Sequence, residues 1–78
     1  MMKLHILTPE SSRSIEAEAV FFPGTRSAFE VFPSHAPIIS TLEAGKLRWR
    51  AAGKEESIDI RGGVMQLEND EIKVCAQL

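Results

Sequence analysis

The residues best suited to chemistry in this chain are two histidines, His5 and His35, and one cysteine, Cys75. A metal site or a nucleophilic centre needs several such groups at a defined spacing, and no known motif of that kind occurs. Ser34 directly precedes His35, but adjacent residues do not form a nucleophile–base pair, and no Gly-x-Ser-x-Gly elbow exists. The sequence therefore predicts no catalytic residue, metal or cofactor, and we expect both histidines to be structural.

The two Gly-Lys pairs at 45–46 and 53–54 are too incomplete for a phosphate-binding loop. Neither is followed by Ser or Thr, and neither has the upstream glycine at the required spacing. The Gly-Thr-Arg-Ser segment at 24–27 could hold a small anion, but a surface turn is the favoured interpretation. Acidic residues are scattered over positions expected to face solvent, so no general acid–base pair is predicted.

Length and composition are those of one small globular domain, residues 1–78. The chain is 44% apolar and 26% charged, with a net charge of -2, and nucleic-acid binding is disfavoured because it needs a concentrated basic face. The single cysteine excludes an internal disulfide and fits a reducing compartment. No secretory signal is recognised, and no apolar run approaches the roughly 18–20 residues that cross a bilayer. We therefore expect a cytoplasmic protein that reaches a membrane only through a partner.

Apolar and polar residues alternate with period two along most of the chain, which is the signature of half-buried strands. Turn residues separate these runs at 23–24, 52–54 and 69–70, and the Gly-Gly pair at 62–63 suggests a bulge or a close backbone approach. Residues 14–20 contain helix formers but alternate like a strand, and we predict a strand there. The pattern predicts an all-β fold, a small flattened antiparallel sandwich of about ten short strands.

One predicted hairpin closes at residues 52–55. In that register Arg48 would lie near Asp59, and Arg50 near Ser57 or Glu56. Opposite charges across a strand pair contribute roughly 0.2–1 kcal/mol and help to fix the register.

The segment 32–39, Phe-Pro-Ser-His-Ala-Pro-Ile-Ile, is the least ordinary part of the sequence. A loop stiffened by two prolines has little freedom to lose on binding, which favours a contact surface. The prolines could equally just end one strand and start another.

These residues also carry a family resemblance. The segment from Val31 to Ser40, followed by Leu-Glu-Ala-Gly at 42–45, resembles the signature of ATP synthase epsilon subunits. The motif residues are Pro33, His35, Ala36, Pro37, Gly45, Gly62 and Gly63. The start at 4–10, the segment 61–67 and the last strand at 72–76 are similar to the family in the same order, so that the resemblance covers essentially the whole chain.

The resemblance implies a β-sandwich in the central stalk of a proton-translocating ATP synthase. There it would bind the gamma subunit and the loops of the c ring, as a non-catalytic rotor part that couples ion-driven rotation to ATP synthesis. It would be peripheral, at the cytoplasmic face of the bacterial inner membrane. The implied gamma-facing residues are Thr8, His35 and Ser40, and the implied ring-facing ones are Arg26, Ser27, Ala28 and Glu30.

The chain departs from the family in two places. The ring-facing loop lacks the usual glycines, and its acidic group stands at Glu30, so the loop is expected to take another path. The sequence ends with the last predicted strand, from which we expect coupling without inhibition by a helical tail and without a regulatory nucleotide site.

Two other classes of protein stay open at this point. A free-standing β-sandwich module that binds a metabolite or carbohydrate would need several aromatics around a pocket, whereas Trp49 alternates with arginines and is expected in the core. A small hydrolase that uses His35 would lack an identifiable nucleophile, acid partner and oxyanion donor.

Overall fold

The computed structural model describes residues 1–78 and contains seven β-strands. Their bounds are β1 Met2–Leu7, β2 Ser12–Ala17, β3 Ala19–Phe22, β4 Phe29–Val31, β5 Ile38–Ala51, β6 Lys54–Glu68 and β7 Glu71–Gln77. They form one sheet in the order β2-β1-β7-β6-β5-β3-β4. The structure has no helix long and apolar enough to cross a membrane.

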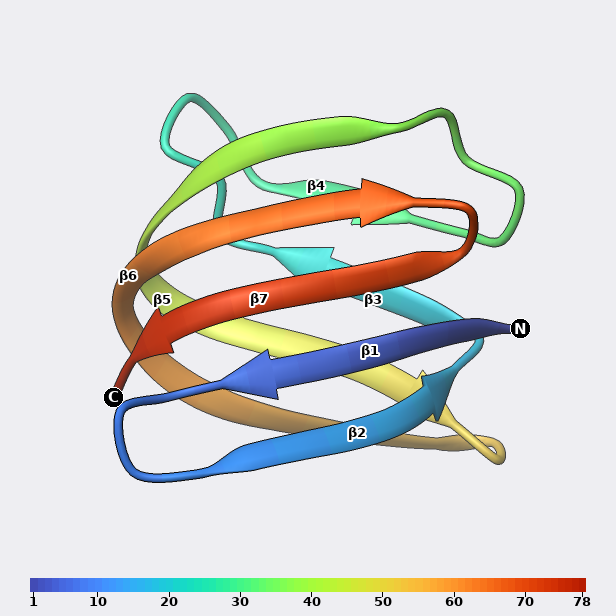
Figure 1. Ribbon diagram of the computed structural model, residues 1–78, viewed down its shortest axis with the longest axis horizontal. Coiled ribbons are helices and arrows are strands. Elements are labelled where there is room, and N and C mark those ends of the chain that lie inside the picture. The colour runs from blue at the N-terminus through green and yellow to red at the C-terminus, as the bar shows by residue number, and fades with distance from the viewer.

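This sheet folds over on itself into two layers (Figure 1). Strands β1, β2 and β7 lie in one layer and β3 and β4 in the other, while the long hairpin β5–β6 curves from one layer into the other. The all-β sandwich predicted from the alternation is confirmed. The seven strands are close to the predicted number of about ten, since β5 and β6 each run through both layers and would count as two strands each if divided at the bend. All pairs are antiparallel except β1 and β7, which are parallel.

The bend of the β5–β6 hairpin is visible as a change in the alternation of buried residues. In β5 the buried positions change from even numbers, as at Leu42, to odd numbers, as at Leu47. In β6 they change from Ile60 to Met65 over the Gly-Gly pair. Because side chains alternate across a sheet, this one-residue change keeps apolar residues inside on both sides of the bend.

Gly63 lies where β7 comes close to β6. A Cβ at this position would lie 2.2 Å from the carbonyl oxygen of Cys75 and 3.0 Å from the Cα of Ala76, both backbone atoms. The β6–β7 register runs through this point without interruption. The predicted close backbone approach is therefore confirmed, and the alternative of a bulge is wrong.

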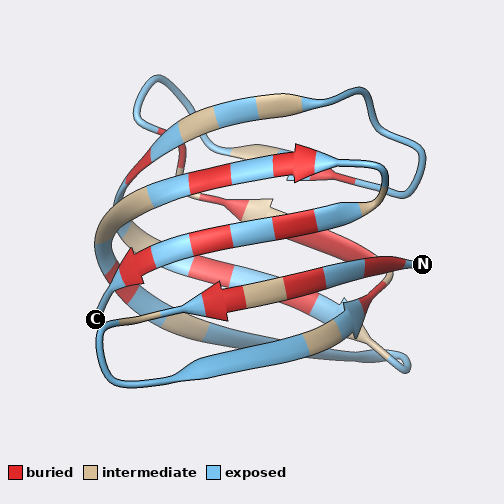
Figure 2. Cartoon of the chain, in the orientation of Figure 1, coloured by how far each residue is buried: buried red, intermediate tan, exposed pale blue.

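The core lies between the two layers, and buried residues alternate with more exposed ones most clearly along β1 and β7 (Figure 2). Trp49 is its largest member and is fully buried, as the sequence predicted. The guanidinium of Arg13 covers the Trp49 ring from β2, with 5.2 Å between the guanidinium carbon and the ring centroid. This contact links the edge strand β2 to the core residue of the opposite layer.

Two hairpins close with two-residue turns whose central residues both have positive φ. These are Ala52 and Gly53 at 51° and 75°, and Asn69 and Asp70 at 51° and 58°. Two consecutive positive φ values define the type I′ turn, which matches the twist of the flanking strands. The turns predicted at these two places are confirmed, whereas the Pro-Gly pair at 23–24 opens a longer loop between β3 and β4.

The tight turn at 52–53 overturns the predicted pairing of the β5–β6 hairpin. Arg48 lies opposite Ser57, and Asp59 lies opposite Lys46. The four-residue closure assumed from the sequence was wrong because Ala52 and Gly53 alone reverse the chain. The charges still pair: Lys46 Nζ lies 3.2 Å from Asp59 Oδ1, and Arg48 reaches diagonally to Glu55 at 2.8 Å.

The segment 14–20 is extended, as predicted, but it belongs to two strands. It changes layer at Glu18, whose N–H donates to the carbonyl of Arg50 at 2.8 Å. The Glu18 carboxylate also accepts from the N–H of Gly53 at 3.2 Å. Strand β2 is thereby held at the end of the β5–β6 hairpin.

Candidate interaction surface

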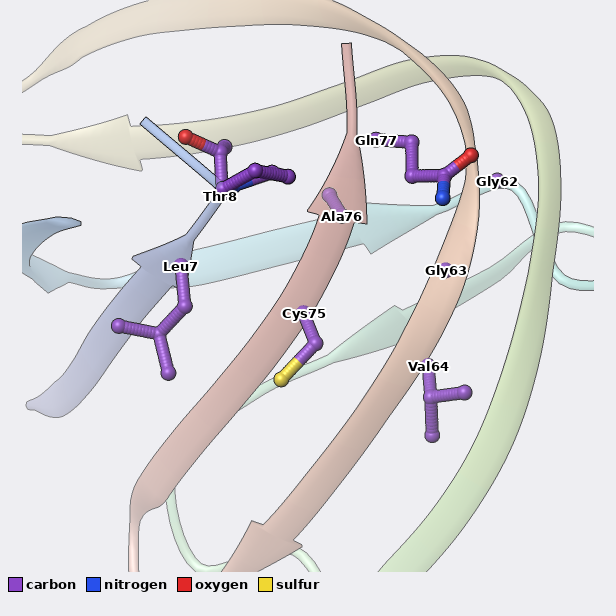
Figure 3. Close-up of a pocket in the computed structure, with 9 residues that line it drawn as sticks. Leu7, Thr8, Gly62, Gly63, Val64, Cys75, Ala76 and Gln77 are labelled. Carbon is purple, nitrogen blue, oxygen red and sulfur yellow. The ribbon is translucent and has the colours of Figure 1, made fainter. Parts of the chain in front are cut away.

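A row of apolar side chains crosses the outward face of the layer that contains β1 and β7. Leu7 on β1 lies beside Cys75 on β7, and Cys75 lies opposite Val64 on β6. Leu7 is 38% exposed and Val64 46% exposed. Figure 3 shows these three side chains on the same side of neighbouring strands. Large apolar side chains that share one exposed row are typical of surfaces that bind a partner.

These residues line a groove of about 530 Å³ that continues toward the turn after β1. Thr8 and Pro9 form one wall, and Gln77 lies at the end of β7. Gly62 and Gly63, which lie opposite Gln77 and Ala76, form the other wall and leave it without side chains, because β7 passes too close for a Cβ at 63. The centre of the groove is thus lined by apolar side chains, and the wall formed by Gly62 and Gly63 is lined by backbone atoms.

A second exposed region is the loop between β4 and β5, residues 32–37. It contains Phe32, which is 49% exposed, and the exposed His35. Ser34 has a φ of 67°, and its N–H donates to Asp70 Oδ1 at 2.7 Å. His35 Nδ1 lies 2.7 Å from the carbonyl oxygen of Ala36. The loop is therefore held by side-chain contacts, and both of its prolines lie outside the strands.

A third region is the loop between β3 and β4. The N–H of Thr25 donates to the carbonyl of Thr41 at 3.2 Å, and the two threonine hydroxyls lie 2.8 Å apart. Arg26 to Ala28 follow as exposed residues, and Phe29 then stacks on Phe22 with 5.2 Å between ring centroids. The loop is anchored at both ends and presents its middle to solvent.

The structure brings some of the predicted site residues together and separates others. Arg26, Ser27 and Ala28 lie in one loop, and Glu30 is exposed on the adjoining β4. Thr8 follows Leu7, which pairs with Cys75, so Thr8 lies near the C-terminal end of β7. His35 lies at the opposite end of β7, beside the β6–β7 turn. Ser40 is half-buried on β5. The three predicted gamma-facing residues therefore do not form one cluster.

Sequence reasoning missed the apolar row. The available signal was that Leu7 follows Ile6 and so breaks the period-two alternation of β1, which places an apolar residue on the outward face. The sequence did not show that Val64 faces outward, because this depends on the change in the alternation of buried residues at the bend of β6. Cys75 becomes a neighbour of Leu7 only through the parallel pairing of β1 and β7.

His5 makes a second set of contacts that the sequence did not reveal. Its Nδ1 lies 2.8 Å from Ser14 Oγ, and its Nε2 lies 3.3 Å from Glu71 Oε1. A carboxylate accepts from the Nε2–H of a neutral ring, which leaves Nδ1 to accept from the serine hydroxyl. The side chain ties β2, β1 and β7 together, which agrees with a structural role.

The family comparison matches the whole chain. The sequence model of the ATP synthase delta/epsilon chain β-sandwich domain matches residues 1–78. The chain is 36% identical over 76 residues to the ATP synthase epsilon chain of Myxococcus xanthus, covering 96% of this chain and 56% of that protein. It is 34% identical over 74 residues to that of Desulfitobacterium hafniense, covering 94% and 56%. The chain thus spans about half the length of these relatives.

Solved structures share the fold at low sequence identity. A chain from the central stalk and c-ring of Tetrahymena thermophila mitochondrial ATP synthase superposes with a TM-score of 0.85 at 12% identity. The match covers 99% of this chain and 63% of that one. A chain from Euglena gracilis mitochondrial ATP synthase gives 0.90 at 15% identity, covering 96% and 49%. These likenesses establish the β-sandwich architecture.

Proposed function

Because this chain belongs to the family of ATP synthase delta/epsilon chain β-sandwich domains, we propose that it is a rotor part of a proton-translocating ATP synthase. In this role it binds the gamma subunit and the c-ring loops, and it couples ion-driven rotation to ATP synthesis without catalysing a reaction itself. The observation that carries the proposal is the exposed apolar row of Leu7, Cys75 and Val64 on the outward face of the sheet.

The mechanism that suits this structure is mechanical. Each strand of the sheet is paired with its neighbours from β2 to β4. The hairpin β5–β6 connects the two layers, and its strands pair on both sides of the bend, with a gap only at Ala44 and Arg61. Such a close-packed body resists deformation and transmits strain. A torque applied at one surface is thereby passed to another surface with little internal movement.

The apolar groove is the proposed docking site of the gamma subunit. Thr8, assigned to the gamma side from the resemblance, lines this groove together with Leu7 and Val64. His35 extends the proposed surface toward the other end of the same layer, whereas Ser40 pairs with the buried Met65 and therefore faces the inner side of β5. Apolar side chains at the centre of an interface with polar residues around them are the usual anatomy of a stable complex.

The loop between β3 and β4 is the proposed contact with the c ring. Arg26, Ser27 and Ala28 are exposed, and Glu30 follows on β4, so the loop offers charged and small polar groups to polar ring loops. Membrane association would be peripheral, through the ring. The bacterial relatives support a place on the cytoplasmic face of the inner membrane.

Complex formation with the cognate gamma subunit tests this function. We expect a stoichiometric complex in size-exclusion chromatography with light scattering, which persists at raised salt because the contact is mainly apolar. Val64→Glu should weaken it at least about tenfold, as expected for a charge placed at an interface centre. Ser57→Glu is the matched control, since Ser57 is also exposed on β6 but lies near the β5–β6 turn, outside the groove and far from the 32–37 loop.

Separate elution of the two unmodified proteins would contradict the proposed function. Equal weakening by both substitutions would show that added negative charge, and not the apolar row, disturbs the contact.

A further inference from the structure

The loop that carries His35 is held in place by a residue from a distant part of the chain. The N–H of Ser34 donates to Asp70 Oδ1 at 2.7 Å, across 36 positions in the sequence. Asp70 is the second residue of the β6–β7 turn and is half-buried. A hydrogen bond to a carboxylate is shorter and stronger than one between neutral groups. One side chain therefore connects the β4–β5 loop to the β6–β7 turn.

The loop has few other means of keeping its shape. Pro33 and Pro37 have no backbone N–H to donate, and the backbone hydrogen bonds outside the strands involve no residue of 32–37. Ser34 moreover adopts a φ of 67°, a conformation that costs a non-glycine residue free energy. A contact that compensates for this cost is needed at Ser34, and the bond to Asp70 is that contact.

Asp70 is itself fixed from the other side. Its backbone carbonyl accepts from the N–H of Lys3 at 2.8 Å, which joins the turn to the start of β1. Its φ of 58° is one that aspartate and asparagine adopt more readily than most residues. Asp70 is thus fixed to the part of the sheet formed by β1 and β7, and its hydrogen bond with Ser34 fixes the loop to the same part.

The next residue, His35, has one ring nitrogen engaged in a hydrogen bond. Its Nδ1 lies 2.7 Å from the carbonyl oxygen of Ala36, and a carbonyl oxygen only accepts, so Nδ1 must carry the hydrogen. In the neutral ring Nε2 then has a free lone pair. The side chain is exposed, and it therefore presents an acceptor to whatever binds there.

We propose that Asp70 is a positioning residue for partner recognition, holding the 32–37 loop so that His35 Nε2 accepts a hydrogen bond from a donor group of the partner. The donor is a hydroxyl, an amide N–H or a cationic side chain, since each can pair with an imidazole lone pair. This inference rests on the proposed function, in which the partner at this loop is the gamma subunit.

Three variants separate the side chain of Asp70 from the turn that it occupies. Asp70→Gly removes the carboxylate but keeps a residue that tolerates positive φ. Asp70→Asn keeps an acceptor oxygen and the same backbone preference. Asn69→Gly is the matched control, because it changes the neighbouring turn residue and leaves the contact with Ser34 intact.

Hydrogen exchange at the Ser34 amide measures the positioning directly. We expect at least about tenfold faster exchange in Asp70→Gly, near-normal exchange in Asp70→Asn and no change in Asn69→Gly. Affinity for the gamma subunit should fall about fivefold or more in Asp70→Gly, with recovery in Asp70→Asn. Unfolding followed by the fluorescence of the buried Trp49 verifies that each variant is folded.

Unchanged Ser34 exchange in Asp70→Gly would overturn the positioning role. Faster exchange together with normal affinity would overturn its link to recognition. If the unmodified chain does not bind gamma at all, the proposed function fails, and the inference about recognition fails with it, while the exchange result still decides how the loop is held.

The acceptor role of His35 has its own pair of variants. Glutamine can place an oxygen near the position of Nε2, whereas the shorter asparagine reaches only the position of Nδ1. We expect His35→Gln to bind gamma within about twofold of the unmodified chain and His35→Asn to bind at least about fivefold more weakly. Equal affinities, or the reverse order, would contradict an acceptor at Nε2.

Discussion

The apolar groove and the 32–37 loop lie at different ends of one layer, and they are built in different ways. The groove takes its shape from strand pairing: the register of β1, β7 and β6 places Leu7, Cys75 and Val64 in one row. The loop takes its shape from two side-chain contacts, Ser34 with Asp70 and His35 with Ala36. The backbone geometry of a surface made by a ladder can change only if the sheet is disturbed, whereas a surface held by single contacts can be released alone.

The largest effect that this comparison predicts is in Gly63→Ala. A Cβ there would lie 2.2 Å from the backbone oxygen of Cys75, so that β7 must shift away from β6. We expect a loss of about 2–4 kcal/mol in the free energy of unfolding, in the range of overpacked core positions. Urea denaturation followed by Trp49 fluorescence measures it.

Gly53→Ala is the control for this substitution. Gly53 has a φ of 75° with open space around it, so an added methyl group costs only backbone strain of about 1–2 kcal/mol. Similar losses in the two variants would contradict a close approach of strands at Gly63.

The second prediction concerns Cys75, whose thiol is free and exposed in the groove. Alkylation with a bulky maleimide should fill the groove and reduce affinity for the gamma subunit about tenfold or more, since a bulky group at an interface centre prevents close packing. Bound gamma should in turn slow the alkylation. Cys75→Ser treated with the same reagent is the control, and full affinity of the alkylated chain would exclude the groove as the docking site.

The third prediction is that release of the loop leaves the sheet intact. Asp70→Gly removes one partly exposed contact and no core packing, so its free energy of unfolding should fall by only about 1 kcal/mol. The same urea titration compares it with Gly63→Ala. A loss as large as that of Gly63→Ala would remove the distinction between the two regions.

The smallest effect is expected at the β5–β6 turn, which belongs to neither surface. Ala52 has a φ of 51°, and Ala52→Asn would create the Asn-Gly pair that type I′ turns favour. We expect a gain of roughly 0.5–1 kcal/mol in the free energy of unfolding. Gamma binding should be unchanged, and a change in affinity would indicate that this turn contacts the partner.

Much of the fold was readable from the sequence because alternation is a local property. The strands, the buried Trp49 and the turns at 52–53 and 69–70 follow from residue types within a few positions. The predicted β5–β6 register was wrong because it assumed a four-residue turn where the structure has a two-residue turn. The two turns place charged residues opposite each other in similar patterns, so the sequence does not distinguish them. The number of strands was predicted only approximately, because in the sequence a long strand that bends resembles two short ones.

The candidate surfaces were less predictable because they depend on contacts between distant segments. The motif around His35 identified an unusual loop, but nothing in the sequence links Ser34 with Asp70. The groove depends on the parallel pairing of β1 with β7, the chain's first and last strands. Period-two patterns show which residues face outward, and they do not show which outward residues become neighbours.

The most direct test of the proposed gamma-binding surface is hydrogen exchange across the whole chain, measured alone and with the cognate gamma subunit. We predict that gamma protects the groove at residues 62–65 and 75–77 and, in the same complex, the amides of Ser34 and His35. The absence of a complex would contradict the rotor function. Protection confined to β3 and β4, with the groove and the loop unprotected, would show that gamma binds the opposite layer.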